Sequence, residues 1–257
     1  MKKIILLFTG IISAAAFNFA SAQESKSFSF GFKVSPNFAW VKVQEGPMTN
    51  NGLGLGFTYG VTADFMLLKN QNYWLSTELD VTSLPSKVQH TGDLKGSSGN
   101  NATYKNVQFN YNNQYLQIPV SIKFKTDDLG GMKYYMQFGL GMSFAMQKKV
   151  ETISDPNIYD KSGLSSHDPN NPSNDIYDFA GIDNNNNNKQ DPNLTFKDDI
   201  NTFRGSMIIG AGVEYHLSGN MNMVAGLKFD NGFTDIFADA RVNGRNNFLS
   251  LQVGLTF

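Results

Sequence analysis

Apolar and polar residues alternate with a period of two in eight separate segments of this 257-residue chain. The first segment is 28–40, where nearly every second side chain is Phe, Val or Trp, and the last is 249–257. The six others are 55–67, 73–81, 116–124, 134–146, 203–217 and 221–229. Strict alternation is typical of β-strands with one apolar face, so the pattern predicts an all-β fold.

The segments between these eight strands alternate in length. Longer stretches lie at 44–52, 84–113, 150–201 and 231–246, and short ones at 68–72, 126–131 and 217–220. The order long, short, long places all the long loops at one end of an up-and-down antiparallel sheet. An even strand number with long loops outside the cell and short periplasmic turns is typical of a transmembrane β-barrel of the bacterial outer membrane, which is the location we expect.

The second face of each strand is polar, which distinguishes a membrane barrel from a soluble barrel with an apolar interior. Ten charged residues fall on this face: Lys33, Asp64, Glu78, Asp80, Lys123, Lys125, Arg204, Glu214, Lys228 and Asp230. An eight-stranded barrel has room only for side chains inside it, so these charges are expected to pair. We therefore predict a self-neutralised polar plug without an open pore. The alternative places several of these charges at the rims, in water.

Aromatic residues near the strand ends suit the girdles that membrane barrels place at the lipid–water interfaces. They are Phe28, Trp40, Tyr59, Tyr73, Trp74, Tyr134, Tyr215, Phe229 and Phe257. The closing stretch "LSLQVGLTF" ends its apolar row on Phe257. This ending resembles the signal by which outer-membrane barrels are recognised for assembly, so the barrel-assembly machinery is an expected partner.

The N-terminus carries the three parts of a secretory signal peptide: Lys2 and Lys3, an apolar stretch from 4 to about 17, and the sequence Ala20-Ser21-Ala22. We expect cleavage after Ala22, which leaves 23–257 as one barrel domain. A membrane anchor is the alternative, but the apolar stretch is short for a span. Cleavage leaves 19 basic and 22 acidic residues, a net charge of −3 that gives no electrostatic case for nucleic acid. The absence of cysteine excludes disulfides and a lipid anchor at this site.

No catalytic, cofactor-binding or metal-binding residue is assigned from the sequence. Of the three histidines, His90 and His167 fall in expected loops and His216 near a strand end, with no Ser/His/acid set at a common depth, so we do not expect an enzyme. The run "DNNNNNKQD" at 183–191 has acidic and amide residues at alternate positions. It lacks the Gly and the final Glu of an EF-hand loop, so we favour an asparagine-rich loop over a calcium site.

Four motifs are similar to those of the PorT-like outer-membrane β-barrel family of Bacteroidetes. They are "YLQIPVSIKF" (115–124), "FGFKVSPNFAW" (30–40), "FDNGFTDI" (229–236) and "RNNFLSLQVGLTF" (245–257). The resemblance implies a small barrel in the outer membrane. Gln117 stands where the family often has Glu, and this puts in doubt any role tied to that carboxylate. The namesake of the family is linked to protein secretion, but these short motifs do not imply that role for this chain.

Three functions remain open at this point. The first is a structural or surface-interaction barrel whose long loops contact an extracellular or envelope partner. The second is a transport element for small solutes or lipids, which needs an open lumen or a lateral gap. The third is an accessory component of an envelope or secretion machine. In each case the outer wall is expected to contact outer-membrane lipids and lipopolysaccharide.

Overall fold

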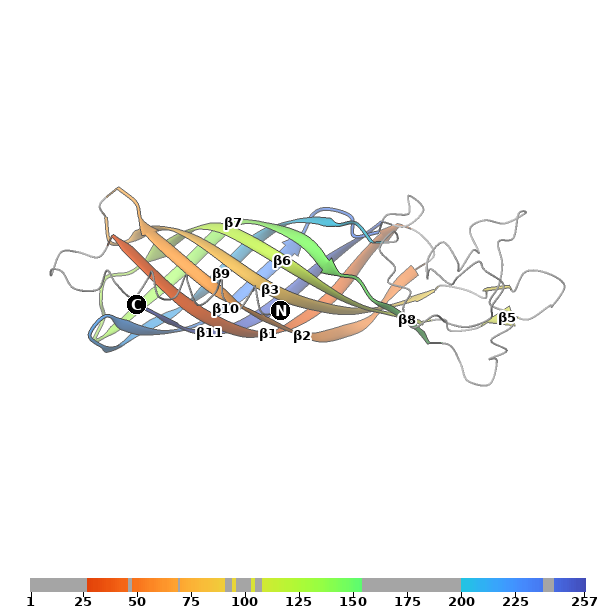
Figure 1. Ribbon diagram of the computed structural model, residues 1–257, viewed down its shortest axis with the longest axis horizontal. Coiled ribbons are helices and arrows are strands. Elements are labelled where there is room, and N and C mark those ends of the chain that lie inside the picture. Colours follow the sequence, from red (N-terminus) through yellow and green to blue (C-terminus); the bar gives the residue numbers. More distant parts are fainter. Residues whose placement is uncertain are drawn as a thin grey trace, which may run out of the picture.

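Eight strands of the described chain close into an antiparallel barrel (Figure 1). The computed structural model describes residues 27–45, 48–68, 70–90, 94–95, 103–104, 108–153, 200–237 and 243–257. The barrel strands are β1 (Phe28–Glu45), β2 (Met48–Met66), β3 (Tyr73–His90), β6 (Gln108–Lys125), β7 (Met132–Gln147), β9 (Phe203–Ser218), β10 (Met221–Gly232) and β11 (Asn243–Thr256). In the described residues no helix is long and apolar enough to cross a membrane.

Each barrel strand pairs with its neighbours in sequence, and β1 pairs with β11 to close the ring. The closing ladder runs from Gly31 opposite Thr256 to Glu45 opposite Asn243. Beyond this ladder, Phe257 exchanges two backbone hydrogen bonds with Phe30, and the two rings stack at 5.5 Å. The predicted eight-stranded up-and-down barrel is therefore confirmed, and the last residue of the chain belongs to its seam.

Three short β-elements lie outside the ring of eight. β8 (Val150–Ile153) pairs with residues 108–111 of β6, beyond the stretch of β6 that pairs with β7. β4 (Leu94–Lys95) and β5 (Thr103–Tyr104) form a separate two-stranded sheet. All three lie near the end of the barrel where the long connections were expected. We call this end the loop end, and the opposite end, which holds Phe28 and Phe257, the turn end.

The strands extend further toward the loop end than the alternation predicted. Residues 44–52 were expected to be a loop, but β1 continues to Glu45 and β2 begins at Met48. Residues 84–90 and 108–113, expected within a long loop, are parts of β3 and β6 that pair with each other. At 84–90 and 108–113 the prediction was wrong because the apolar residues lie on the opposite face from those of the rest of the strand. At 44–52 the residues are polar or glycine apart from Pro47 and Met48, so no alternation marks the strand there.

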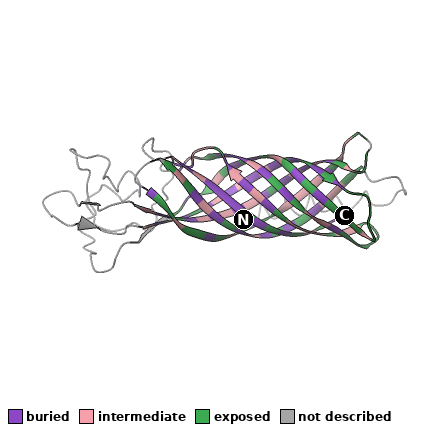
Figure 2. Cartoon of the chain, turned by 180° about the vertical axis from the view of Figure 1, so that it is seen from behind, coloured by how far each residue is buried: buried purple, intermediate pink, exposed green. Residues whose placement is uncertain are grey.

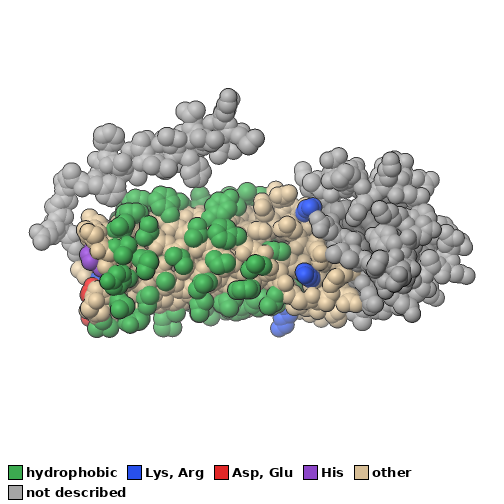
Figure 3. Space-filling model, turned by 90° about the horizontal axis from the view of Figure 1, so that it is seen from below, with side chains coloured by type: hydrophobic (Ala, Val, Ile, Leu, Met, Phe, Trp, Pro, Cys, Tyr) green, Lys and Arg blue, Asp and Glu red, His purple; other side chains and the backbone are tan. Residues whose placement is uncertain are grey.

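The two faces of each strand differ in exposure along its length, and buried and exposed residues alternate in stripes around the wall (Figure 2). On the outside, Leu, Met, Phe and Tyr side chains form a broad band over the turn-end part of the barrel (Figure 3). We call it the apolar band. It confirms that the apolar face predicted for the eight strands points outward and the polar face inward.

Aromatic pairs lie at both edges of the apolar band. At the turn end, Phe28 packs on Phe65 at 5.1 Å, and at the loop end Trp40 stacks on Phe229 at 6.0 Å between ring centroids. Trp74, predicted to join a girdle, was placed wrongly. It has the inward register of β3, is buried, and donates a hydrogen bond from its indole nitrogen to the Gln71 carbonyl at 2.7 Å.

Candidate functional site: the barrel lumen

A four-residue cluster of charges fills the middle of the lumen. Lys33 of β1 contacts both Glu78 and Asp80 of β3, with its Nζ 2.8 Å from Asp80 Oδ2. Lys228 of β10 approaches the same two carboxylates, at 2.8 Å from Glu78 and 3.6 Å from Asp80. All four side chains are buried. Two cations facing two anions make this central cluster electrically neutral, although its members come from three strands.

A second neutral cluster lies nearer the turn end. Lys123 of β6 is 2.7 Å from Asp64 of β2, and Lys125 is 3.6 Å from the same carboxylate and 2.8 Å from Glu214 of β9. Asp64 also accepts a hydrogen bond from Ser76 at 2.6 Å. The Lys125 ammonium lies 4.5 Å from the centroid of the buried Trp74 ring, a cation–π contact made inside the barrel.

The third interior group is a single ion pair between Arg204 of β9 and Asp230 of β10, on the loop-end side of the central cluster. Arg204 also donates to the backbone carbonyl of Asn246 at 2.8 Å. The second oxygen of Asp230 accepts hydrogen bonds from Gln117 at 2.6 Å and from Ser206 at 3.0 Å. Both carboxylate oxygens are therefore satisfied by side chains from two strands, β6 and β9.

Gln117 has a definite role at this pair. Its amide Nε2 is the donor to Asp230, whereas an ionised Glu has no donor to offer. A glutamate at this position would place a second carboxylate against Asp230, and the single guanidinium of Arg204 would then face two negative charges. The glutamine that departs from the PorT-like motif thus matches the charge balance of this lumen.

All ten charges predicted on the inner face form ion pairs with one another, in groups of four, four and two. Each of them is buried in the described structure, so the alternative that several sit in water at the rims is not what the structure shows. Burial of a charge is costly, and only close partners and further hydrogen bonds compensate for it. The closest partners here are within hydrogen-bonding distance, so the lumen is filled by mutually neutralised side chains.

Toward the loop end the interior becomes apolar, which the sequence analysis did not predict. Ala39, Leu84, Tyr115 and Phe248 form a buried cluster, with Ala145 packed against it. Val41, Val88, Phe109 and Ile208 are also buried on the inward register. A signal was present in the sequence, since apolar residues of β6 occupy odd positions up to Tyr115 and even positions from Leu116 onward.

Two chain segments at the loop end are bound to each other, and Ile200, Ile236 and Phe237 are buried there. Ile200 and Phe237 form a β-bridge, and the ring of Phe237 packs against Tyr111 at 5.7 Å. The Asn201 side chain donates to the carbonyls of Asp235 and Phe237 at 3.0 and 2.8 Å. We call residues 200–202 and 233–237 the cap.

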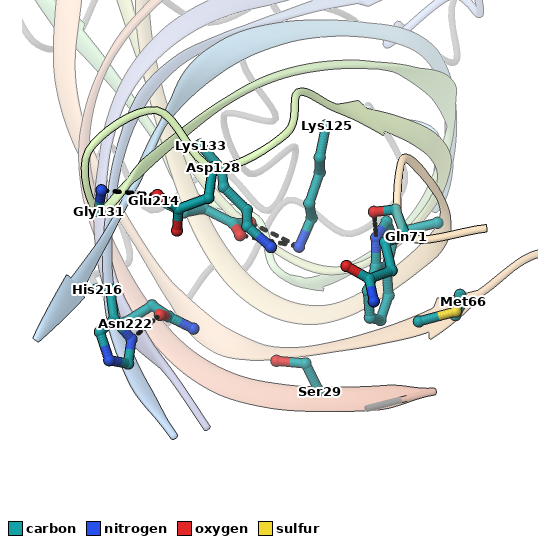
Figure 4. A pocket seen from close by; sticks show the side chains of 11 residues that line it. Ser29, Met66, Gln71, Lys125, Asp128, Gly131, Lys133, Glu214, His216 and Asn222 are labelled. Atoms are coloured by element: carbon teal, nitrogen blue, oxygen red, sulfur yellow. Dashed lines mark hydrogen bonds and ion pairs between the residues drawn. The ribbon is translucent and has the colours of Figure 1, made fainter. Parts of the chain in front are cut away.

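The turn end holds a cavity of about 210 Å³ (Figure 4). Its lining includes Lys125 and Glu214 from the second cluster, together with Asp128, Lys133 and His216. The Asp128 carboxylate accepts a hydrogen bond from the Gly131 backbone at 2.7 Å, and a ring nitrogen of His216 bonds to Asn222 at 3.1 Å. The cavity is a mouth above the charge clusters and leads into side chains that are already paired.

The histidines and the 183–191 run singled out from the sequence are not found in the lumen among the described residues. His216 lies at the turn-end rim, and the side chain of His90 is outside the described part. His167, the 183–191 run and the predicted signal peptide 1–22 lie outside the described residues. The interpretation of 183–191 as an asparagine-rich loop rather than a calcium site therefore stays a prediction.

A family model described as an outer membrane protein beta-barrel domain matches residues 19–238. The chain belongs to this family. The location follows, and the protein is an outer-membrane β-barrel of Gram-negative type. In such barrels short turns face the periplasm and longer loops the exterior, so we expect the turn end of this barrel to be periplasmic and the loop end extracellular.

Solved structures similar to this chain include Neisserial surface protein A, with 13% identity and a TM-score of 0.43 over 91% of this chain and 98% of that one. OprG of Pseudomonas aeruginosa has 8% identity and a TM-score of 0.44, over 92% and 99%. The attachment invasion locus protein Ail of Yersinia pestis has 8% identity and a TM-score of 0.36, over 90% and 100%. No curated protein matches the chain significantly.

Proposed function

We propose that this protein is a non-enzymatic outer-membrane barrel with a closed lumen, which serves a structural or surface-interaction role. The observation that carries the proposal is the pairing of all ten interior charges into three neutral groups. A water-filled channel needs polar groups that remain solvated, whereas these charged side chains are buried and pair with one another. The apolar cluster and the cap support the same proposal at the extracellular end.

The finer assignments belong to the same proposal. Membership of the PorT-like group is supported by the four motifs, with Gln117 as a departure. Assembly through the last strand is supported by the pairing of β11 with β1 and by the stacking of Phe257 on Phe30. The polar loop composition of 154–199 supports contact with an extracellular or envelope partner, and those residues lie outside the described structure.

Planar-bilayer recording tests the closed lumen. The mature protein, shown to be inserted by its heat-modifiable migration on a denaturing gel, is expected to give no large, stable conductance steps. A known porin added to the same bilayer provides the positive control. Large steps that recur with each insertion would contradict the closed lumen and favour the transport alternative.

Co-purification distinguishes the remaining alternative. A structural barrel is expected to be recovered from outer membranes without stoichiometric protein partners from a secretion apparatus. Stable recovery of such partners from crosslinked membranes would instead support an accessory role in an envelope or secretion machine. A variant with residues 160–195 replaced by a short Gly/Ser linker separates a loop-mediated contact from one made by the barrel wall.

A further inference from the structure

Three cations lie on the outer wall just beyond the loop-end edge of the apolar band. Lys42 on β1 and Lys87 on β3 are exposed, and Arg245 on β11 is half-buried; all three have the outward register of their strands. Figure 3 shows Lys and Arg side chains at this edge of the band. We call Lys42, Lys87 and Arg245 the loop-end cations.

Lys42 and Arg245 are direct cross-strand neighbours on the ladder that closes the barrel. Side chains in this relation have Cβ atoms roughly 5 Å apart, and like charges directly opposite each other are destabilising. No acidic side chain of the described residues forms an ion pair with any loop-end cation. The interior charges, by contrast, are all neutralised, so this uncompensated repulsion is a distinct feature of the outer wall.

The position of these cations relative to the membrane indicates what could neutralise them. Trp40, two residues before Lys42 on the same face, stacks on Phe229 at the edge of the apolar band. Aromatic belts lie at the level of the lipid headgroups. Two residues along a strand span roughly 7 Å. The loop-end cations therefore lie beside the headgroups of the outer leaflet.

We propose that Lys42, Arg245 and Lys87 bind the phosphate groups of a phosphorylated glycolipid, the lipopolysaccharide of the outer leaflet. An Arg guanidinium can hold a phosphate with two parallel hydrogen bonds, and a neighbouring Lys adds a point charge. Below the cations, the wall presents Phe38 opposite Leu249, an apolar surface for acyl chains of the same lipid. A lipid contacts both the cations and this apolar surface, whereas a soluble anion contacts only the cations. The proposal goes beyond the closed lumen, because it concerns only the outer wall.

Native mass spectrometry of the mature protein in detergent measures this binding. The probes are phosphorylated lipid A and the same lipid A after enzymatic removal of its phosphates. We expect the wild type to bind the phosphorylated lipid about ten times more tightly than the dephosphorylated lipid, the order of effect for cations at a membrane surface. In K42Q/R245Q that preference is expected to disappear, and in K87Q to fall by about half.

Two controls separate the charge from other effects of substitution. K42R/R245K keeps both charges and is expected to keep the preference. K133Q removes one cation at the periplasmic end and is expected to leave the preference unchanged. K42Q/R245Q is expected to migrate as a folded barrel at least as well as the wild type, because it relieves a repulsion between like charges.

Three results would overturn the proposal. One is equal binding of the two lipids by the wild type, a measurement that needs no variant. Another is an unchanged preference in K42Q/R245Q. The third is tight binding of inorganic phosphate by the wild type without any lipid preference, which would make the site one for a soluble anion. Conductance recording is independent of all three, so failure of this proposal is distinguishable from failure of the closed lumen.

Discussion

The two halves of the barrel, divided at the loop-end edge of the apolar band, have opposite polarity. In the periplasmic half of β6, the inward residues are Gln117, Ser121, Lys123 and Lys125, and the outward ones are apolar. In the extracellular half of the same strand, the inward residues include Phe109, Tyr111 and Tyr115, and the outward ones are Asn110, Asn112 and Gln114. The odd positions of β6 stay buried across this boundary, and its pairing with β3 continues through Gln114 and Tyr115, although its pairing with β7 shifts between these two residues. The residue types exchange faces at Tyr115 and Leu116.

This exchange shows that the surroundings of the wall decide which face is apolar. Where the wall meets lipid, apolar side chains gain nothing by turning inward, and the interior can be filled by paired charges. Where the wall meets water, burial of apolar side chains is again favourable, and the interior resembles that of a soluble barrel. In one continuous sheet, apolar side chains therefore face outward where lipid surrounds the wall and inward where water does. Variants in the two halves are expected to behave differently.

The largest effect is expected from Lys228→Met in the central cluster. Loss of the cation leaves Glu78 and Asp80 with Lys33 as their remaining partner, so one buried carboxylate is uncompensated. Breaking a buried ion pair costs about 3–5 kcal/mol. Denaturant unfolding from lipid vesicles measures this loss. Adding Glu78→Gln restores the charge balance and is expected to recover part of the stability. A single variant as stable as the wild type would show that these charges are not coupled.

A somewhat smaller loss is expected from Phe248→Ala in the apolar cluster of the extracellular half. Truncation leaves a cavity among Ala39, Leu84 and Tyr115, and the cost is about 3 kcal/mol. The matched control is Phe138→Ala in the periplasmic half, where the ring faces lipid and acyl chains can fill the space. The same unfolding assay compares the two. Equal losses for both variants would remove the distinction between the halves.

A still smaller difference is expected when a lysine is placed on the outer face of each half. Leu140→Lys, near the middle of the apolar band, is expected to destabilise the barrel by about 2 kcal/mol. Asn112→Lys, outward on β6 in the extracellular half, is expected to change stability by less than about 0.5 kcal/mol. Unfolding from vesicles measures both. A comparable loss at position 112 would place that residue in lipid and move the boundary of the apolar band.

Much of this molecule was predictable from the alternation of residues alone. All eight barrel strands, the outward direction of their apolar faces and the ten inward charges follow from a period of two, because successive side chains of a strand point to opposite sides. Pairing of those charges followed from the narrow lumen of an eight-stranded barrel. The outward row that ends at Phe257 was also readable, although its stacking on Phe30 depends on closure by a strand more than 200 residues away.

The extracellular extensions of β3 and β6 were missed because a change of environment was mistaken for the end of a strand. Apart from Trp74, the apolar residues of β3 face outward up to Val81, whereas Leu84 and Val88 further along the strand face inward. Both were therefore interpreted as loop residues. Trp74 was assigned to the outer surface by its residue type, although its register is inward and its partner is Lys125. Residues 233–237 of the cap carry no periodic pattern, and their hydrogen bonds to Asn201 come from a distant part of the chain.

By itself, the sequence determined the class of fold, the membrane-facing surface and the charge balance of the interior, because each is a property of alternation along single strands. Only the tertiary structure decided which charges pair, since Lys228 meets Glu78 across a separation of 150 residues. It also decided where the apolar band ends and how Lys42 comes to lie opposite Arg245. These are relations between strands, and they exist only once the barrel has closed and fixed the register of one strand against the next.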